Sequence, residues 1–178
     1  MTTQERTGFL ASLYIKNFRY MWLSLFFSMA GFQIQMTVRG ILVYDITDDA
    51  FLTGLVSAGF APSLLAFSMF GGVLGEKVEK RKLIQFAQGM KCLGRVVVGF
   101  LIFTDFIHWS HLLIISVTQG AMFAIQVPAR QSLIPDLVGK KLVTNAIGLN
   151  SMAMGVTLMI APAIGGYTYE FFGPLNSY

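Results

Sequence analysis

The chain contains 178 residues, of which 54% are apolar and only 12% are charged, and its net charge is +4. This composition excludes a disordered chain, which would be poor in apolar residues. It also argues against a soluble domain, in which about 25% of residues are charged. The single cysteine, Cys92, cannot form an intrachain disulfide, so no disulfide framework supports the fold.

Five long apolar segments follow one another along the chain, and short polar segments separate them. A helix rises about 1.5 Å per residue, so about 20 residues cross a hydrocarbon core of about 30 Å. Strands of a membrane barrel would alternate over about ten residues, a pattern that this sequence lacks. The sequence therefore predicts an all-α polytopic membrane protein with about five transmembrane helices, over residues 18–44, 51–75, 83–104, 109–127 and 143–172. Pro62 and Pro162 interrupt the second and fifth spans and favour kinks there.

The basic residues gather on one side of the predicted membrane. Ten of the 13 Lys and Arg residues lie on the side of the N-terminus, whereas the opposite side has acidic residues and no Lys or Arg. The positive-inside rule therefore predicts a cytoplasmic N-terminus in the cell (inner) membrane. Because the bases mark membrane orientation, no nucleic-acid partner is expected. The ten bases are Arg6, Lys16, Arg19, Lys77, Lys80, Arg81, Lys82, Arg130, Lys140 and Lys141, and the acids opposite are Asp45, Asp48, Asp49, Asp105 and Glu170.

The polar link after the second span places two acids and four bases directly after a glycine-rich helix end. A topology anchor needs only the bases, so the acid beside Gly75 suggests a clamp to a base or a helix N-terminus. The segment resembles the signature loop of the major facilitator superfamily, Gly-Gly-x-Leu-Ala-Asp-Arg-x-x-Arg-Arg-x. The resemblance implies a loop that braces the two halves of a transporter when its cytoplasmic side is closed. The matching residues, called the loop motif below, are Gly72, Glu76, Lys77, Lys80 and Arg81.

The link after the fourth span covers residues 128–138 and includes Pro128, Arg130, Pro135 and Asp136. From the residues alone we expect a helix end with two prolines, capped locally by Asp136. The segment is similar to one efflux branch of the same superfamily, which contains enterobactin and macrolide exporters. Residues 17–19, 22–24 and 145–151 match the same branch.

The fifth span carries Ala161, Pro162, Gly165 and Gly166, in the order Ala-Pro-x-x-Gly-Gly. This resembles the exporter motif Gly-Pro-x-x-Gly-Gly, with alanine in place of the first glycine. The resemblance implies that these residues shape the fifth span against its neighbours in a way that favours export.

Polar residues also lie inside the spans. Gln88, Lys91 and Arg95 fall within about 60° of one helix face, and Gln35 and Arg39 lie one turn apart. Buried bases are costly, so they mark a cavity unless they reach the membrane surface. Arg39 could snorkel outward and Lys91 could reach the cytoplasmic face, whereas Arg95 lies deepest. No Asp or Glu lies in the inner spans, so either opposing spans or an anionic substrate supplies the negative charge.

The sequence contains no phosphate loop, and His108 and His111 lack further ligands at metal spacing. We therefore expect no enzymatic activity, no cofactor and no metal. The resemblance implies a cytoplasmic tail over residues 1–17 and an N-terminal transmembrane half over 18–178. That half contains inverted three-helix repeats and stops near the start of a sixth span.

The expected function is secondary active export of a small organic molecule, drug- or siderophore-like, by alternating access. Its expected partners are the lipid bilayer, the substrate and a second, C-terminal half. Two alternatives remain open: a non-transporting membrane interaction protein or remnant half, and an importer on the same fold.

Overall fold

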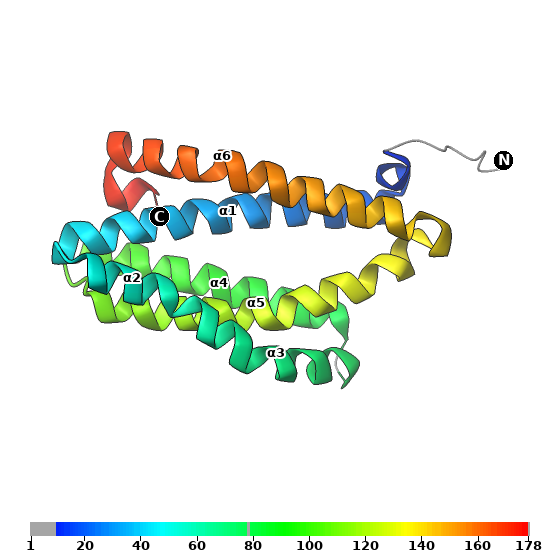
Figure 1. The fold of residues 1–178 in the computed structure, drawn as a ribbon, viewed down its shortest axis with the longest axis horizontal. Coiled ribbons are helices and arrows are strands. Elements are labelled where there is room, and N and C mark those ends of the chain that lie inside the picture. Colours follow the sequence, from blue (N-terminus) through cyan, green and yellow to red (C-terminus); the bar gives the residue numbers. More distant parts are fainter. Residues whose placement is uncertain (1–9, 78, 178) are drawn as a thin grey trace.

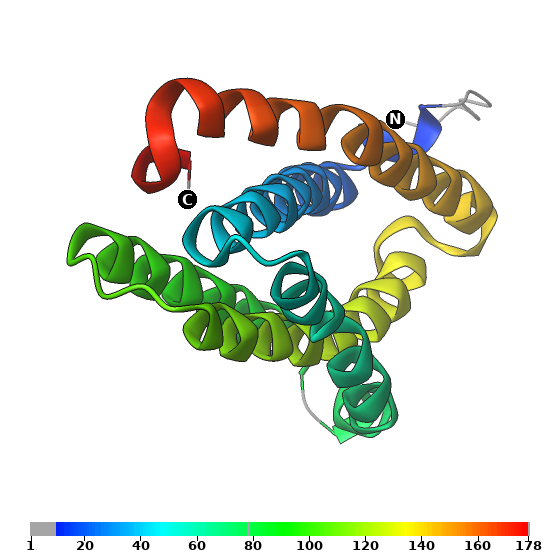
Figure 2. The same ribbon diagram turned by 60° about the vertical axis from the view of Figure 1, so that its left-hand side comes forward.

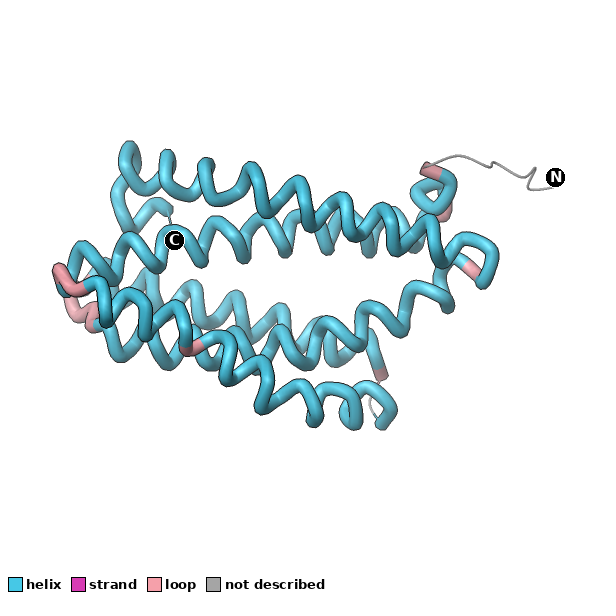
Figure 3. The backbone as a smooth tube through the Cα atoms, viewed as in Figure 1, coloured by secondary structure: helices cyan, strands magenta, loops and turns pink. Residues whose placement is uncertain are grey.

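The computed structural model describes the backbone of residues 10–77 and 79–177, and side chains over residues 10–69 and 79–173. Its described part is helical apart from short connections (Figure 3). Five helical stretches are long and apolar enough to cross a membrane, which confirms the predicted all-α class. The α-helices are α1 Lys16–Thr47, α2 Ala50–Ala58, α3 Phe60–Lys77, α4 Lys80–Phe103, α5 Trp109–Val138 and α6 Val143–Ser177, and two 3-10 helices span Ala11–Tyr14 and Lys140–Leu142. Helix α6 is kinked at Gly173, whose backbone is not helical (φ 75°).

The helices pack around α5. Helices α1 and α6 run side by side, and α3 and α4 lie against α5 (Figures 1 and 2). Helix α5 also contacts α1, α2 and α6. Within its most apolar window, 56% of α5 is buried inside the chain, compared with 22% or less for the other spans. The side chains of α5 therefore face protein, and the other helices present most of their apolar surface outward, as a bilayer requires.

The connections lie at two opposite ends of the bundle (Figure 1). The α1–α2 and α4–α5 connections share one end, and the α3–α4 and α5–α6 connections share the other. The Asp48–Asp49 pair ends one helix and begins the next: Asp48 is left-handed (φ 50°), and the Asp49 carboxylate accepts from Phe51 N at 2.7 Å. This is the N-cap geometry that Asp favours.

Prolines affect two helices in different ways. Span two breaks at Gly59, between α2 and α3, because Pro62 has no N–H for the Ala58 carbonyl and its ring crowds that oxygen. Helix α5, in contrast, continues through Pro128 and Pro135 to Val138. The expected link over residues 128–138 is therefore helical, and the expected end of span four at residue 127 is wrong.

The continuation of α5 has a physical explanation. Each proline removes one intrahelical hydrogen bond, and neighbouring helices can hold the remaining turns in place. The helix ends instead at Gly139 (φ 71°), whose N–H donates to the Pro135 carbonyl at 3.0 Å. Asp136 therefore does not end the helix, and its side chain is directed elsewhere.

Candidate functional site

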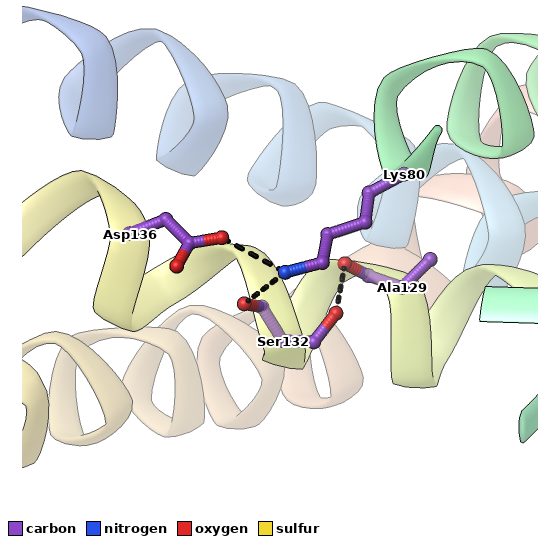
Figure 4. Close-up of polar contacts among 4 residues, drawn as sticks. All are labelled: Lys80, Ala129, Ser132 and Asp136. Carbon is purple, nitrogen blue, oxygen red and sulfur yellow. Dashed lines mark hydrogen bonds and ion pairs between the residues drawn. The ribbon is translucent and has the colours of Figure 1, made fainter. Parts of the chain in front are cut away.

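The loop motif contacts α5 through Lys80, at the start of α4. Lys80 Nζ donates to Asp136 Oδ2 at 2.8 Å and to the Ser132 carbonyl at 3.0 Å (Figure 4). The Ser132 hydroxyl in turn donates to the Ala129 carbonyl at 3.1 Å. The Lys80 side chain is 32% exposed and that of Asp136 is 61% exposed, so water screens the ion pair. We call this contact the end clamp. It joins the loop motif to the segment after Pro128, although the sequence patterns predict the two as separate motifs.

The other loop-motif residues lie on both sides of the α3–α4 connection. Gly72, Glu76 and Lys77 belong to the last turns of α3, but their side chains lie outside the described residues. Arg81 lies in the first turn of α4 and is exposed. The acid that suggests a clamp, Glu76, therefore remains a prediction from sequence.

A buried network joins α1, α4 and α5. Arg39 is 1% exposed and donates from Nη1 to Gln119 Oε1 at 3.0 Å. Gln119 Nε2 donates to Gln35 Oε1 at 2.8 Å, and Arg95 Nε donates to the same oxygen at 3.2 Å. Arg39 therefore faces the bundle interior and does not snorkel outward. Arg95 lies along α1, where a Cβ at Gly31 would be 3.4 Å from one of its terminal nitrogens.

The remaining polar residues of α4 also face neighbouring helices. Lys91 is 7% exposed and donates to Gln126 Oε1 of α5, so it does not reach the cytoplasmic face. Gln88 Nε2 donates to Ser28 Oγ of α1 at 3.2 Å. Of the five residues expected around a cavity, Lys91 lines a described one, a space of about 140 Å³ between α4 and α5. The structure places the other four, Gln35, Arg39, Gln88 and Arg95, in contacts between helices.

A larger cavity of about 390 Å³ lies between α1, α5 and α6. Its wall from α1 is apolar, and α5 contributes Gln126 and Arg130. The sequence predicts that Arg130 lies in the link after the fourth span. In the structure it lies inside α5, two turns before the helix ends. It is 7% exposed. The basic residue that lines the larger cavity is therefore Arg130, and Arg95 does not line it.

Sequence reasoning missed the polar residues of α5. Gln119, Gln126 and Arg130 fall within about 40° of one helix face, at about 100° per residue. A helical moment calculated over the polar residues alone would detect that these three residues share one face of the helix. Hydropathy does not reveal this pattern, because a span that ends at residue 127 separates Arg130 from the two glutamines.

The exporter-like motif of α6 contributes a close contact with α1. Gly165 packs on the α1 backbone, since an added Cβ would lie 3.1 Å from the Ile34 carbonyl oxygen. Ala161, one turn earlier on the same face, is also buried. Pro162 is half-buried and Gly166 has open space at its Cβ position. The small residues of the motif thus set the distance between α6 and α1.

One of the two histidines, His108, caps a helix. The His108 ring accepts from Ser110 N at 3.4 Å at the start of α5, and His111 lies one turn later. Over the described residues, no group of three or more His, Cys, Asp or Glu side chains comes together at metal-binding distance.

Comparison with known proteins places these features in a family. The profile of the family described as "Transmembrane secretion effector" matches residues 7–178. The chain is similar to the staphyloferrin A transporter of Staphylococcus aureus, with 25% identity over 149 residues that cover 83% of this chain and 38% of that protein. It is also similar to the quinolone resistance protein NorA of Staphylococcus aureus, with 24% identity over 152 residues that cover 84% of this chain and 37% of that protein.

The chain therefore spans less than two fifths of the length of these relatives. No solved structure matches it. With its five apolar spans, its loop motif and a family match that covers nearly all of its length, the chain belongs to the transmembrane secretion effector family of the major facilitator superfamily, whose members are multi-pass membrane transporters and not enzymes.

Proposed function

We propose that the chain forms the N-terminal half of a secondary active transporter that exports a small organic molecule by alternating access. The observation that carries the proposal is the cavity of about 390 Å³ between α1, α5 and α6, a volume typical of small-molecule sites. The names of the relatives agree with it, since one transports staphyloferrin A and another confers quinolone resistance. A second set of spans would close the cavity from the opposite side.

The proposed conformational element is the loop motif with its end clamp. Alternating access requires contacts that exist in one conformation and break in the other. The end clamp is suited to this role because Lys80 and Asp136 are partly exposed, so breaking their ion pair costs little. The loop motif would then brace the cytoplasmic face when that face is closed.

The proposed orientation places the N-terminus and the α3–α4 connection in the cytoplasm. On a Cys92→Ala background, we expect an impermeant thiol reagent to label Asp48→Cys only from outside the cell. Lys82→Cys should be labelled only after the inner face is opened to the reagent. Labelling of Asp48→Cys from the cytoplasmic side alone would contradict this orientation.

Export can be measured in everted membrane vesicles from cells that express the intact protein. Staphyloferrin A and a quinolone are the first solutes to test, each with a pH gradient and with a sodium gradient. We expect accumulation that an ionophore for the coupling ion abolishes. Asp136→Ala should slow it, whereas Lys82→Ala, which removes an exposed ion pair within one helix end, should not.

The vesicle orientation separates the alternatives. Accumulation only in right-side-out vesicles would indicate an importer. No flux of any solute in either orientation would indicate a membrane interaction protein, and the proposed function would then be wrong.

A further inference from the structure

The cavity between α1, α5 and α6 contains a buried cation without a partner. All three guanidinium nitrogens of Arg130 lack a hydrogen-bond partner, and the side chain is 7% exposed within this chain alone. No Asp or Glu is among the described residues that line the cavity. A buried, uncompensated charge is strongly unfavourable, so Arg130 requires an anion from outside the described residues.

Gln126 adds a second donor beside Arg130, and Lys91 determines which way its amide faces. A lysine ammonium can only donate, so the Gln126 atom that it contacts must be the carbonyl oxygen Oε1. The amide nitrogen Nε2 then faces away from Lys91, and it has no partner. Gln126 is 2% exposed. Arg130 and Gln126 both line this cavity. Their unpartnered nitrogens are buried beside it, and Lys91 places a second positive charge behind the amide.

The remaining residues of the cavity wall indicate what kind of ligand body would fit. Met21, Leu25 and Met29 of α1 form an apolar side, and Asn150 of α6, whose buried Oδ1 has no partner, also lines the cavity. A guanidinium binds a carboxylate or phosphate with two parallel hydrogen bonds. Methionine and leucine side chains accommodate an aromatic or aliphatic body of variable shape.

We propose that this cavity is an oxyanion site for the transported solute, in which Arg130 and Gln126 bind a carboxylate and the α1 wall holds an apolar body. The proposal rests on the proposed function, because it assigns the substrate class of that transporter. Two other sources of an oxyanion are a lipid phosphate and a carboxylate on the opposing spans. The solute is favoured because the cavity has an apolar wall and the volume of a small-molecule site.

The test is a binding measurement that requires no flux. The intact protein is purified into nanodiscs of phosphatidylcholine, and its affinity is measured for naphthalene-2-carboxylate and for the methyl ester of the same acid. We expect the acid to bind and the ester to bind at least tenfold more weakly. Arg130→Gln should weaken binding of the acid about 10- to 100-fold, the range for losing hydrogen bonds to a charged group. Arg130→Lys should fall between, because it keeps the charge and loses the paired geometry.

Two further variants make the test specific. Lys141→Gln, an exposed residue in the connection before α6, removes one positive charge as Arg130→Gln does and should leave binding unchanged. Gln126→Glu places a carboxylate against Lys91 and Arg130 at nearly constant volume. It should abolish binding of the acid while the protein remains folded, so it provides the test if Arg130→Gln fails to fold.

Several results would overturn the proposal. These are equal binding of acid and ester, wild-type affinity in Arg130→Gln, and wild-type affinity in Gln126→Glu. Stabilisation by phosphatidylglycerol that depends on Arg130, without binding of the acid, would assign the site to a lipid phosphate. Absence of binding with normal folding would assign Arg130 to an ion pair with the opposing spans.

The binding test also separates failure of the site from failure of the proposed function. Binding that depends on Arg130 in a protein that moves no solute would support the site and contradict the proposed export function. Export without binding would support the export function and contradict the site.

Discussion

Replacement of Gly120 by alanine should separate α3 from α5. An added Cβ would meet the Phe60 carbonyl oxygen at well under 3.0 Å and would lie 3.0 Å from Ser63 Cβ. The first obstacle is backbone, which cannot rotate away. To regain ordinary van der Waals contact of about 3.5 Å, the two helices must move apart by about 1 Å. That movement would also stretch the hydrogen bond from Ser63 Oγ to the Val117 carbonyl, which is 2.5 Å long.

The expected loss of stability follows from these contacts. Overpacking costs about 1–3 kcal/mol, and a weakened hydrogen bond adds about 0.5–1.5 kcal/mol. The better helix propensity of alanine offsets about 1 kcal/mol. The net destabilisation is therefore about 0.5–3.5 kcal/mol, and each kcal/mol lowers the melting temperature of a domain of this size by about 2–4 °C.

The assay is thermal unfolding of the purified intact protein in detergent. The matched control is Gly99→Ala on α4, where an added Cβ would meet nothing within 4 Å, so its melting temperature should not fall. Equal melting temperatures for Gly120→Ala, Gly99→Ala and the wild type would refute the close α3–α5 contact. A fall confined to Gly120→Ala would support it.

Three further predictions concern the motifs. Lys80→Ala and Asp136→Ala should each slow transport. A double-mutant cycle of the free energy of unfolding should give a coupling energy between the two residues of about 0.2–1 kcal/mol, as for exposed ion pairs. Strictly additive effects of the two substitutions would contradict the end clamp. Glu76→Ala should reduce transport at near-normal membrane abundance, because a charge-assisted contact would be lost in only one conformation; unchanged transport would leave the loop as a topology anchor. Gly165→Val should lower the melting temperature because Gly165 packs on the α1 backbone, whereas Gly166→Val should change it less, since open space surrounds that position; equal effects would argue against the close contact.

The number and class of the spans could be predicted because hydropathy over about 20 residues is a local property. The boundary of the fourth span could not, because hydropathy falls wherever polar residues cluster, whether the helix stops or continues. Pro128 and Pro135 suggest a stop, yet α5 continues to Val138. The helix survives because a proline removes only one hydrogen bond, and the helices packed against α5 can hold the remaining turns in place.

The residues that form the candidate site could be named from the sequence only in part. Periodicity places Lys91 and Arg95 on one face of α4, since 100° per residue relates positions along a single helix. It does not relate positions on different helices. The contact of Lys91 with Gln126, and of Arg95 with Gln35, depends on how far α4 is shifted along α5 and α1.

The sequence by itself determined that the chain crosses a membrane as helices, with its connections alternating between two faces. The apolar length and the charge of a segment are properties of that segment alone, so both can be evaluated without knowing how the helices pack. The tertiary structure alone decided that Arg130 is buried beside a cavity without a partner, while Arg39 and Arg95 are bound in a network of amides. Whether a base inside a span is paired depends on the helices that face it, because burial and hydrogen bonding are properties of the space between helices.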